Sequence, residues 1–114
     1  MSFFKQFGKL ASGFNAFTTA TTTTLITPGA DEWVDIYNIV ISTNDTAQQQ
    51  VTIDDSTNTI GVYFVGGGAG NATVLDLSTI PVRGKKAGAI RATVASITGA
   101  KTIAVKVVAL ISKT

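Results

Sequence analysis

The acidic residues in the middle of the chain are the first candidates for chemistry. Asp54 and Asp55 are neighbours, with Asp45 before them and Asp76 after them. Paired carboxylates catalyse glycoside hydrolysis, and clustered carboxylate oxygens bind calcium. Neighbouring residues of a strand, however, point to opposite faces, and no EF-hand spacing is present. The run DDSTN at residues 54–58 is typical of a turn in which Asp and Asn bond their own backbone, so we expect turn chemistry and no metal site.

A glycine-rich run, GGGAGN at residues 66–71, is the second candidate because such loops can cradle a phosphate. The dinucleotide fingerprint needs a helix directly after the glycines and an acidic residue about 20 positions further on. A strand-like segment follows here, and the chain has no GK[ST] motif. We therefore expect a loop between two strands and no nucleotide cofactor.

Nucleophilic catalysis by serine lacks a partner in this chain. The sequence contains no histidine and no cysteine. Their absence removes the commonest general base, the commonest metal ligand and all thiol chemistry. Lysine is the base that remains for a serine, and no spacing singles out a Ser–Lys pair. The composition therefore predicts a protein that is not an enzyme and that needs no cofactor.

Two aromatic residues, Trp33 and Tyr37, lie on the same face of one expected strand. Such a pair can form a platform for sugars or bases, but large aromatic residues more often fill a core or an interface. We expect an interface between subunits that includes Trp33 and Tyr37 together with Asp35, Arg83 and Arg91. A carbohydrate-binding module with Trp33 and Tyr37 as its platform is the alternative.

The composition indicates one all-β domain. The chain has 114 residues, of which 45% are hydrophobic and only 14% are charged, with 18 threonines and 11 glycines. This is the composition of strands and turns. Expected strands are one that ends near Ile26 and others at residues 33–43, 49–54, 59–65, 73–77, 89–95 and 102–112. Short strands at regular spacing predict a jelly-roll-like β-sandwich of about seven or eight strands.

Alternation along these strands predicts which side chains form the core. Residues 33–43 are apolar on both faces, which is typical of a central strand that is covered on both sides. Simple alternation places Val34, Ile36 and Val40 on one face of this strand. It places Ile39 and Ile41 on the other face, with Trp33 and Tyr37. In the other strands the expected inward residues are Val51, Ile53, Ile60, Val62, Phe64, Ile90, Ala92, Val94, Ile103, Val105, Val107 and Ile111.

The N-terminal segment has a different pattern. Its phenylalanines and one leucine recur every three or four residues over residues 3–17, which is typical of one face of an amphipathic helix. The threonine-rich run at residues 18–24 favours extended structure. We therefore expect a separate arm over residues 1–24, formed by a short amphipathic helix or an extended segment, and a β-sandwich domain over residues 25–114. The expected scaffold-binding residues of the arm are Phe3, Phe4, Phe7, Leu10, Phe14 and Phe17.

Charge is distributed unevenly along the chain. Residues 31–82 contain all seven acidic residues and no base, whereas residues 83–114 contain seven bases and no acidic residue. This arrangement favours cross-strand pairing inside the domain, and a self-complementary surface between copies is the alternative. The basic residues are not interleaved with aromatic ones, so we expect no nucleic acid partner. The arm contains two lysines and the chain has no run of 18 apolar residues, so we do not expect a membrane partner.

The pattern of residues 51–111 resembles a type of small β-domain found among bacteriophage virion proteins. The shared features are a hairpin at 51–65, a glycine-rich loop at 66–70, a leucine-flanked acidic strand at 75–77, a Pro-hydrophobic-Arg-Gly step at 81–84 and two final strands at 89–95 and 102–111. The phenylalanine-rich N-terminal segment is not part of this pattern.

The resemblance implies a non-enzymatic structural protein of the virion. Domains of this type occur in capsid decoration (cement) proteins and in head or tail fibre proteins, and they are often trimeric. It therefore implies a cement protein that forms a homotrimer, binds and stabilises the shell of major capsid protein, and lies on the capsid surface of a virion assembled in the host cytoplasm. A phage tail, fibre or baseplate component is the alternative within this class.

Overall fold

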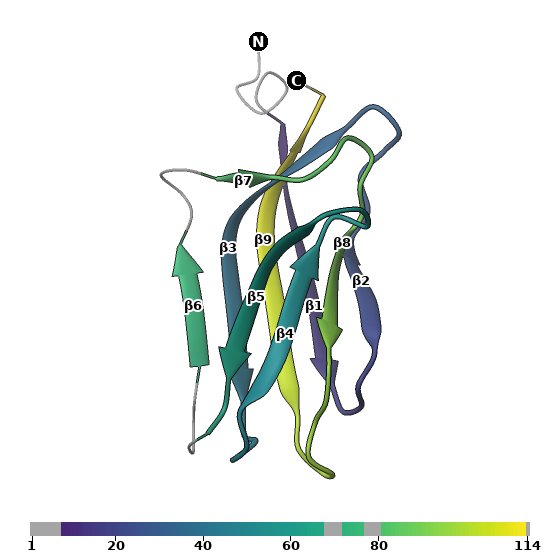
Figure 1. Cartoon of the computed structure of the whole chain (residues 1–114). Helices are drawn as coiled ribbons and strands as arrows, with labels where there is room; N and C mark the ends of the chain where they lie inside the picture. The colour runs from purple at the N-terminus through teal and green to yellow at the C-terminus, as the bar shows by residue number, and fades with distance from the viewer. Residues whose placement is uncertain (1–7, 68–71, 77–80, 114) are drawn as a thin grey trace.

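The protein is a sandwich of two antiparallel β-sheets (Figure 1). The computed structural model describes residues 8–67, 72–76 and 81–113, with the backbone alone for 72–76. The described residues form nine strands: β1 (Lys9–Phe17), β2 (Thr22–Ile26), β3 (Trp33–Thr43), β4 (Gln49–Asp54), β5 (Thr59–Val65), β6 (Ala72–Asp76), β7 (Val82–Arg83), β8 (Ile90–Val94) and β9 (Ile103–Ser112). The seven expected strands match β2 to β6, β8 and β9 closely, whereas β1 and β7 were not expected as strands.

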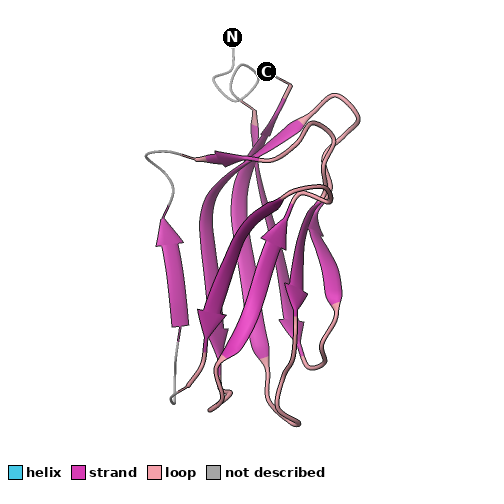
Figure 2. Ribbon diagram, viewed as in Figure 1, coloured by secondary structure: helices cyan, strands magenta, loops and turns pink. Residues whose placement is uncertain are grey.

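The order of the strands is that of a jelly roll. One sheet has the order β1-β9-β3-β6, with the short strand β7 also paired to β3, and the other has the order β2-β8-β4-β5. Most successive strands lie in opposite sheets, the exceptions being β4 with β5 and β6 with β7, as in two interlocked Greek keys. Strands and loops make up the described chain (Figure 2). The predicted jelly-roll-like β-sandwich is confirmed.

The core lies between the two sheets and is almost entirely aliphatic. The predicted inward residues of β4, β8 and β9 are all buried, with at most 7% of each side chain exposed. Period-two alternation located them in β4 and β8 because the outward residues of these strands are polar, and in β9 because Lys106 marks the outward side. The buried apolar residues are Phe17, Ile26, Val34, Ile36, Ile39, Ile41, Val51, Ile53, Val65, Ile90, Ala92, Val94, Ile103, Val105, Val107, Ala109 and Ile111.

A β-bulge in β3 changes the predicted faces of that strand. The register between β3 and β9 shifts between Ile36 and Asn38, so Tyr37 is an extra residue in the ladder. Ile39 and Ile41 are therefore buried on the same side as Ile36, and the prediction that they share a face with Trp33 was wrong. Simple alternation fails beyond a bulge because the extra residue exchanges the two faces.

Strand β5 also differs from its prediction. Val62 and Phe64 were expected in the core, but they are 44% and 57% exposed. Tyr63 and Val65 face the core instead, and Ile60 packs against its margin. All these residues are apolar, so alternation could not decide the face, and the pairing of β5 with β4 decided it.

The N-terminal segment was expected as a short amphipathic helix or an extended arm, and its described part is a strand of the sandwich. β1 pairs with β9 along its whole length, from Lys9 with Ile111 to Phe17 with Ile103. Gly13 permits the close approach of β1 to β2, because a Cβ atom at this position would collide with the carbonyl oxygen of Leu25. A spacing of three and four residues looks helical, but here it places Leu10 and Phe14 on one face and Phe17 on the other.

The expected boundary between an arm and a domain at residue 24 falls inside β2. β1 belongs to the five-stranded sheet and β2 to the four-stranded sheet, so the described residues before position 25 are part of the sandwich. Phe3, Phe4 and Phe7 lie outside the described residues. Phe17 was expected to bind a scaffold, but it is 1% exposed and forms part of the core, so that assignment was wrong.

Asp45 joins three segments at one end of the sandwich. Its carboxylate is buried and accepts hydrogen bonds from the Ala47 amide, the Gln49 side chain, and both the amide and the hydroxyl of Thr98, at 2.8 to 2.9 Å. The hydrogen bond from the Thr98 amide is the main cause that lowers the pKa of Asp45 to about 2. The charged form of Asp45 is therefore the form that holds the loop after β3 against the turn before β9.

We predict that Asp45→Asn lowers the melting temperature at pH 7 by roughly 5–10 °C, because an amide nitrogen cannot accept two of these hydrogen bonds. The pKa of Asp45 is about 2 in the folded state and 3.8 ordinarily. A lowered pKa stabilises the fold above pH 3.8, and this contribution is lost as the pH falls toward 2. The wild type should therefore approach the variant in stability over that interval.

Thermal unfolding from pH 7 to pH 2, followed by circular dichroism, checks this result. Asp31→Asn is the matched control, because the Asp31 side chain is 64% exposed. A constant difference in melting temperature between wild type and Asp45→Asn over the whole range would contradict the prediction.

Candidate functional site

The outer face of the five-stranded sheet is unusually apolar. The register places Leu10 beside Leu110 and Phe14 beside Lys106, and Lys106 is in turn beside Val40. Leu10 and Phe14 are 65% and 63% exposed. We call this surface the docking face and define it by Leu10, Phe14, Val40, Lys106, Val108 and Leu110.

The outer face of the other sheet is polar by comparison. The outward residues at its centre form cross-strand rows of threonine and charged side chains, including a hydrogen bond of 2.8 Å between the Thr22 and Thr93 hydroxyls. Its exposed large apolar residues are Val62 and Phe64 on the edge strand β5. The sandwich therefore has one face suited to water and one suited to burial.

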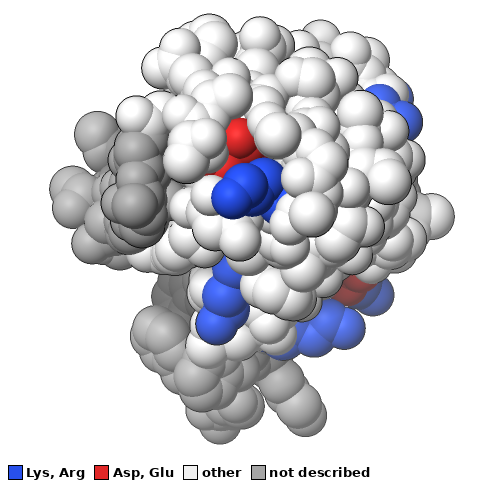
Figure 3. Space-filling model, turned by 90° about the horizontal axis from the view of Figure 1, so that it is seen from below, with Lys and Arg blue, Asp and Glu red and all other residues white. Residues whose placement is uncertain are grey.

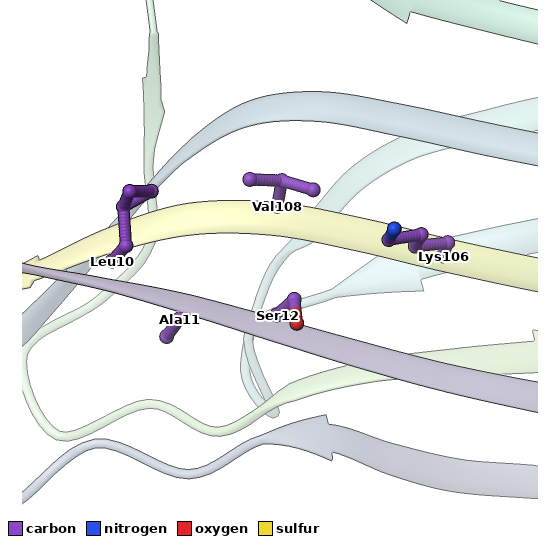
Figure 4. Close-up of a pocket in the computed structure, with 5 residues that line it drawn as sticks. All are labelled: Leu10, Ala11, Ser12, Lys106 and Val108. Atoms are coloured by element: carbon purple, nitrogen blue, oxygen red, sulfur yellow. The ribbon is translucent and has the colours of Figure 1, made fainter.

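The docking face is hollowed between β1 and β9. Leu10, Ala11, Ser12, Lys106 and Val108 line an open hollow of about 310 Å³ (Figure 4). Strand β9 has apolar side chains on both faces, and β3 has them on both faces as well. Strands of this kind are normally covered on both sides. No described part of the chain covers the docking face.

Trp33 lies at one end of the same sheet, among charged residues. The Arg83 guanidinium donates two hydrogen bonds, of 2.7 and 2.9 Å, to the Asp35 carboxylate, and this contact raises the pKa of Arg83. Arg83 and Lys86 also approach the Trp33 ring, each 5.3 Å from its centre. The structure thus brings Trp33, Asp35 and Arg83 together within one chain, whereas Tyr37 lies in the bulge of β3. Their role in an interface between subunits stays a prediction.

The expected pairing of acidic and basic segments occurs inside the chain. Asp35 and Arg83 are cross-strand partners, and so are Asp54 and Arg91, whose side chains are 2.8 Å apart. Asp54 raises the pKa of Arg91 through this hydrogen bond. The acidic atoms visible in Figure 3 lie beside basic ones. Cross-strand pairing within one domain is therefore confirmed.

The turn predicted at residues 54–58 is confirmed. Asp55 accepts hydrogen bonds from the Thr57 and Asn58 amides at 3.0 and 2.6 Å, and from the Lys85 amide at 2.8 Å. These bonds outweigh burial, so the pKa of Asp55 is lowered. Among the described residues no three acidic side chains are grouped so that they could hold a metal ion. Most of the glycine-rich run at 66–71 lies outside the described residues.

Sequence reasoning found two of the six residues that define the docking face. Leu10 and Phe14 were expected to bind a scaffold, and both are exposed on this face. Val40, Lys106, Val108 and Leu110 were not singled out. The signal that could have found them is the run IAVKVVALIS in β9, whose outward positions are apolar except for Lys106.

Jelly rolls of this kind occur in viral capsid and lectin domains, and the solved structures similar to this chain include phage capsids. A chain of the cyanophage Pam1 capsid asymmetric unit is 18% identical, with a TM-score of 0.57, and the match covers 91% of this chain and 86% of that one. A chain of the acid-stable capsid of the Helicobacter pylori bacteriophage KHP30 is 9% identical, with a TM-score of 0.65 and coverage of 95% and 91%. These likenesses show a shared fold.

No protein-family model matches the sequence, and no curated protein matches it. The described residues contain no helix that is long and apolar enough to cross a membrane.

Proposed function

We propose that this chain is a non-enzymatic structural protein of a bacteriophage virion, and that it decorates the capsid as a cement protein. The observation that carries the proposal is the apolar docking face, which no described part of the chain covers. Chains of two phage capsids have the same small jelly-roll fold. Each match covers most of this chain and most of the capsid chain, so the chains are similar in length.

In this proposal the docking face binds the shell of major capsid protein. Leu10 and Phe14 supply exposed apolar area, and the expected arm residues Phe3, Phe4 and Phe7 precede them in the chain. Burial of apolar area contributes about 25 cal/mol per Å² before the costs of association. Each bound copy would join neighbouring shell subunits and so stabilise the shell on the outer surface of the virion, after assembly in the host cytoplasm.

Co-sedimentation with shells assembled from the major capsid protein of the same virus tests the proposal. We expect the protein to pellet with the shells at saturable stoichiometry and to raise their disassembly temperature. Protein that stays in the supernatant at every shell concentration would contradict a capsid role. Antibody labelling of virions in the electron microscope then distinguishes a capsid position from the alternative of a tail, fibre or baseplate component.

The carbohydrate-binding alternative receives less support from the geometry. A sugar platform needs an open aromatic face, whereas Arg83 and Lys86 both approach the Trp33 ring. Trp33, Asp35 and Arg83 instead form a polar cluster beside the docking face. We propose that they lie in an interface with a neighbouring protein, as large aromatic residues and arginine commonly do.

We further propose that the protein is a homotrimer. Val62 and Phe64 support this, because they form a second exposed apolar patch on the edge strand β5, away from the docking face. A contact between copies at β5 leaves the docking face free for the shell. Several linked docking faces would raise the effective concentration of each, so that weak single contacts become durable.

We predict that Val62→Lys combined with Phe64→Lys converts the trimer into monomers, because both changes place charge in the contact between copies. Light scattering should show the mass of three chains for the wild type and of one chain for the variant. Thr24→Lys is a control on the outer face of the same sheet and should leave the mass unchanged. A monomeric wild type, or a variant that keeps the wild-type mass, would contradict this assignment.

A further inference from the structure

Lys106 lies in the middle of the docking face. Phe14 and Val40 flank it on the neighbouring strands, and Ala104 and Val108 share its side of β9. The side chain is exposed, and no ion pair or hydrogen bond of its ammonium group occurs among the described residues. A single positive charge therefore stands at the centre of an apolar surface.

Covering this surface removes water from the ammonium group. An ion that loses water without gaining a partner is strongly unfavourable, whereas a paired and hydrogen-bonded ion is tolerated. We propose that the docking face binds an apolar protein surface that carries a carboxylate, and that this carboxylate pairs with Lys106. This inference rests on the proposed function, and it specifies the chemistry of the partner surface on the shell.

A second copy of this chain does not fit that description. If two docking faces met around a two-fold axis, their Lys106 side chains would face each other as like charges. Each described carboxylate of the chain also has a partner within the chain already. Three form ion pairs: Asp31 with Lys113, Asp35 with Arg83 and Asp54 with Arg91. The other three accept hydrogen bonds from backbone amides: Glu32 from Gly29, Asp45 from Thr98 and Asp55 from Lys85. Among the described residues this favours a different protein as the source of the carboxylate.

A nucleic acid or an anionic membrane fits less well. Both bind through several cations that are distributed over a surface, with a gain of about 1 kcal/mol for each basic residue near a membrane. The docking face has one central cation, whose neighbours in the register and along β9 are Phe14, Val40, Ala104 and Val108, with Ser12 in the adjoining hollow. A surface of that composition fits a protein with a matching apolar patch and one central acidic residue.

Lys106→Met and Lys106→Glu test the inference through equilibrium binding to shells of major capsid protein. Methionine keeps the apolar stem and removes the charge, so it leaves the carboxylate on the shell buried without a partner. We expect binding to weaken at least tenfold with Lys106→Met and at least a hundredfold with Lys106→Glu. Binding of the wild type should also weaken as salt is raised, and Lys106→Met should reduce that dependence.

Lys101→Met is the matched control, because Lys101 lies in the turn before β9 and not on the docking face. Thermal unfolding of each variant checks that the fold is retained.

If Lys106→Met binds as well as the wild type or better, Lys106 reaches solvent at the rim and the inference is wrong. The inference would also be wrong if the wild type binds phosphatidylglycerol vesicles or duplex DNA and Lys106→Glu abolishes that binding. Failure of the wild type to bind shells at all contradicts the proposed function instead.

Discussion

Phe14→Asp is expected to weaken binding to capsid shells by about a hundredfold or more, which is the effect of removing an interface hot spot. Phe14 is 63% exposed and stands beside Lys106 on the docking face. The substitution removes the largest apolar side chain of that face. It also places a negative charge where the partner is expected to be apolar, and it competes for Lys106. Titration of shells with labelled protein measures the loss.

The fold should tolerate this change, because the Phe14 side chain contributes little to the core. We expect the melting temperature of Phe14→Asp to stay within about 3 °C of the wild type, as for most exposed positions. Thr24→Asp introduces the same charge on the outer face of the other sheet, opposite Arg91 in the register, and should bind shells normally. Equal losses for both variants would show that negative charge in general weakens binding, and that the docking face is wrongly assigned.

Phe17→Ala is expected to destabilise the protein by about 3–5 kcal/mol, the usual cost of emptying a buried aromatic site. Phe17 is 1% exposed and lies among the largest fully buried side chains of the core. The melting temperature should fall by roughly 15 °C or more. Urea unfolding followed by circular dichroism measures the change directly, since the midpoint shifts while the slope stays constant.

Phe14→Ala is a matched control for this prediction, because it removes the same side chain from the same strand three residues earlier. It should change the free energy of unfolding by less than about 1 kcal/mol. Deletion of residues 1–17 removes β1 from the five-stranded sheet and should prevent folding, whereas deletion of residues 1–7 should not. A stable protein without residues 1–17 would mean that the N-terminal segment is a separable arm after all.

The polar part of the candidate site was partly predictable. The pairing of Asp35 with Arg83 spans 48 residues, and it was expected in kind because the acidic and basic residues occupy separate segments. The sequence did not indicate which acid meets which base, because the partners are set by the register of β3 with β7 and of β4 with β8. The same holds for the carboxylate of Asp45, whose partner Thr98 lies 53 residues away.

The apolar part of the site was harder to predict. Leu10 and Phe14 attracted attention by their type, but their spacing suggested a helix. In isolation the spacing of the large apolar residues fits a helix and not the alternation of a strand, and only the ladder with β9 selects the strand. Val108 and Leu110 appeared to be ordinary strand residues, since no local signal says whether the outward face of a strand meets water or a partner.

Local alternation was enough to identify an all-β sandwich and most of its strands. The strands β4, β8 and β9 show their inward residues directly, because a period of two is imposed by the backbone of each strand alone. Strand ends follow equally from turn residues such as those at 54–58. These features depend on neighbours within a few positions, so they can be read without the rest of the fold.

The faces of β1, β3 and β5 were decided only by tertiary structure. In β3 an extra residue at Tyr37 exchanges the faces, and in β5 the pairing with β4 exposes Val62 and Phe64. In β1 the pairing with β9 divides one run of large side chains, so that Phe17 is buried and Phe14 is exposed. The physical reason is common to all three: where both sides of a strand carry large apolar residues, the pairing with other strands chooses which side forms the core and which side stays exposed.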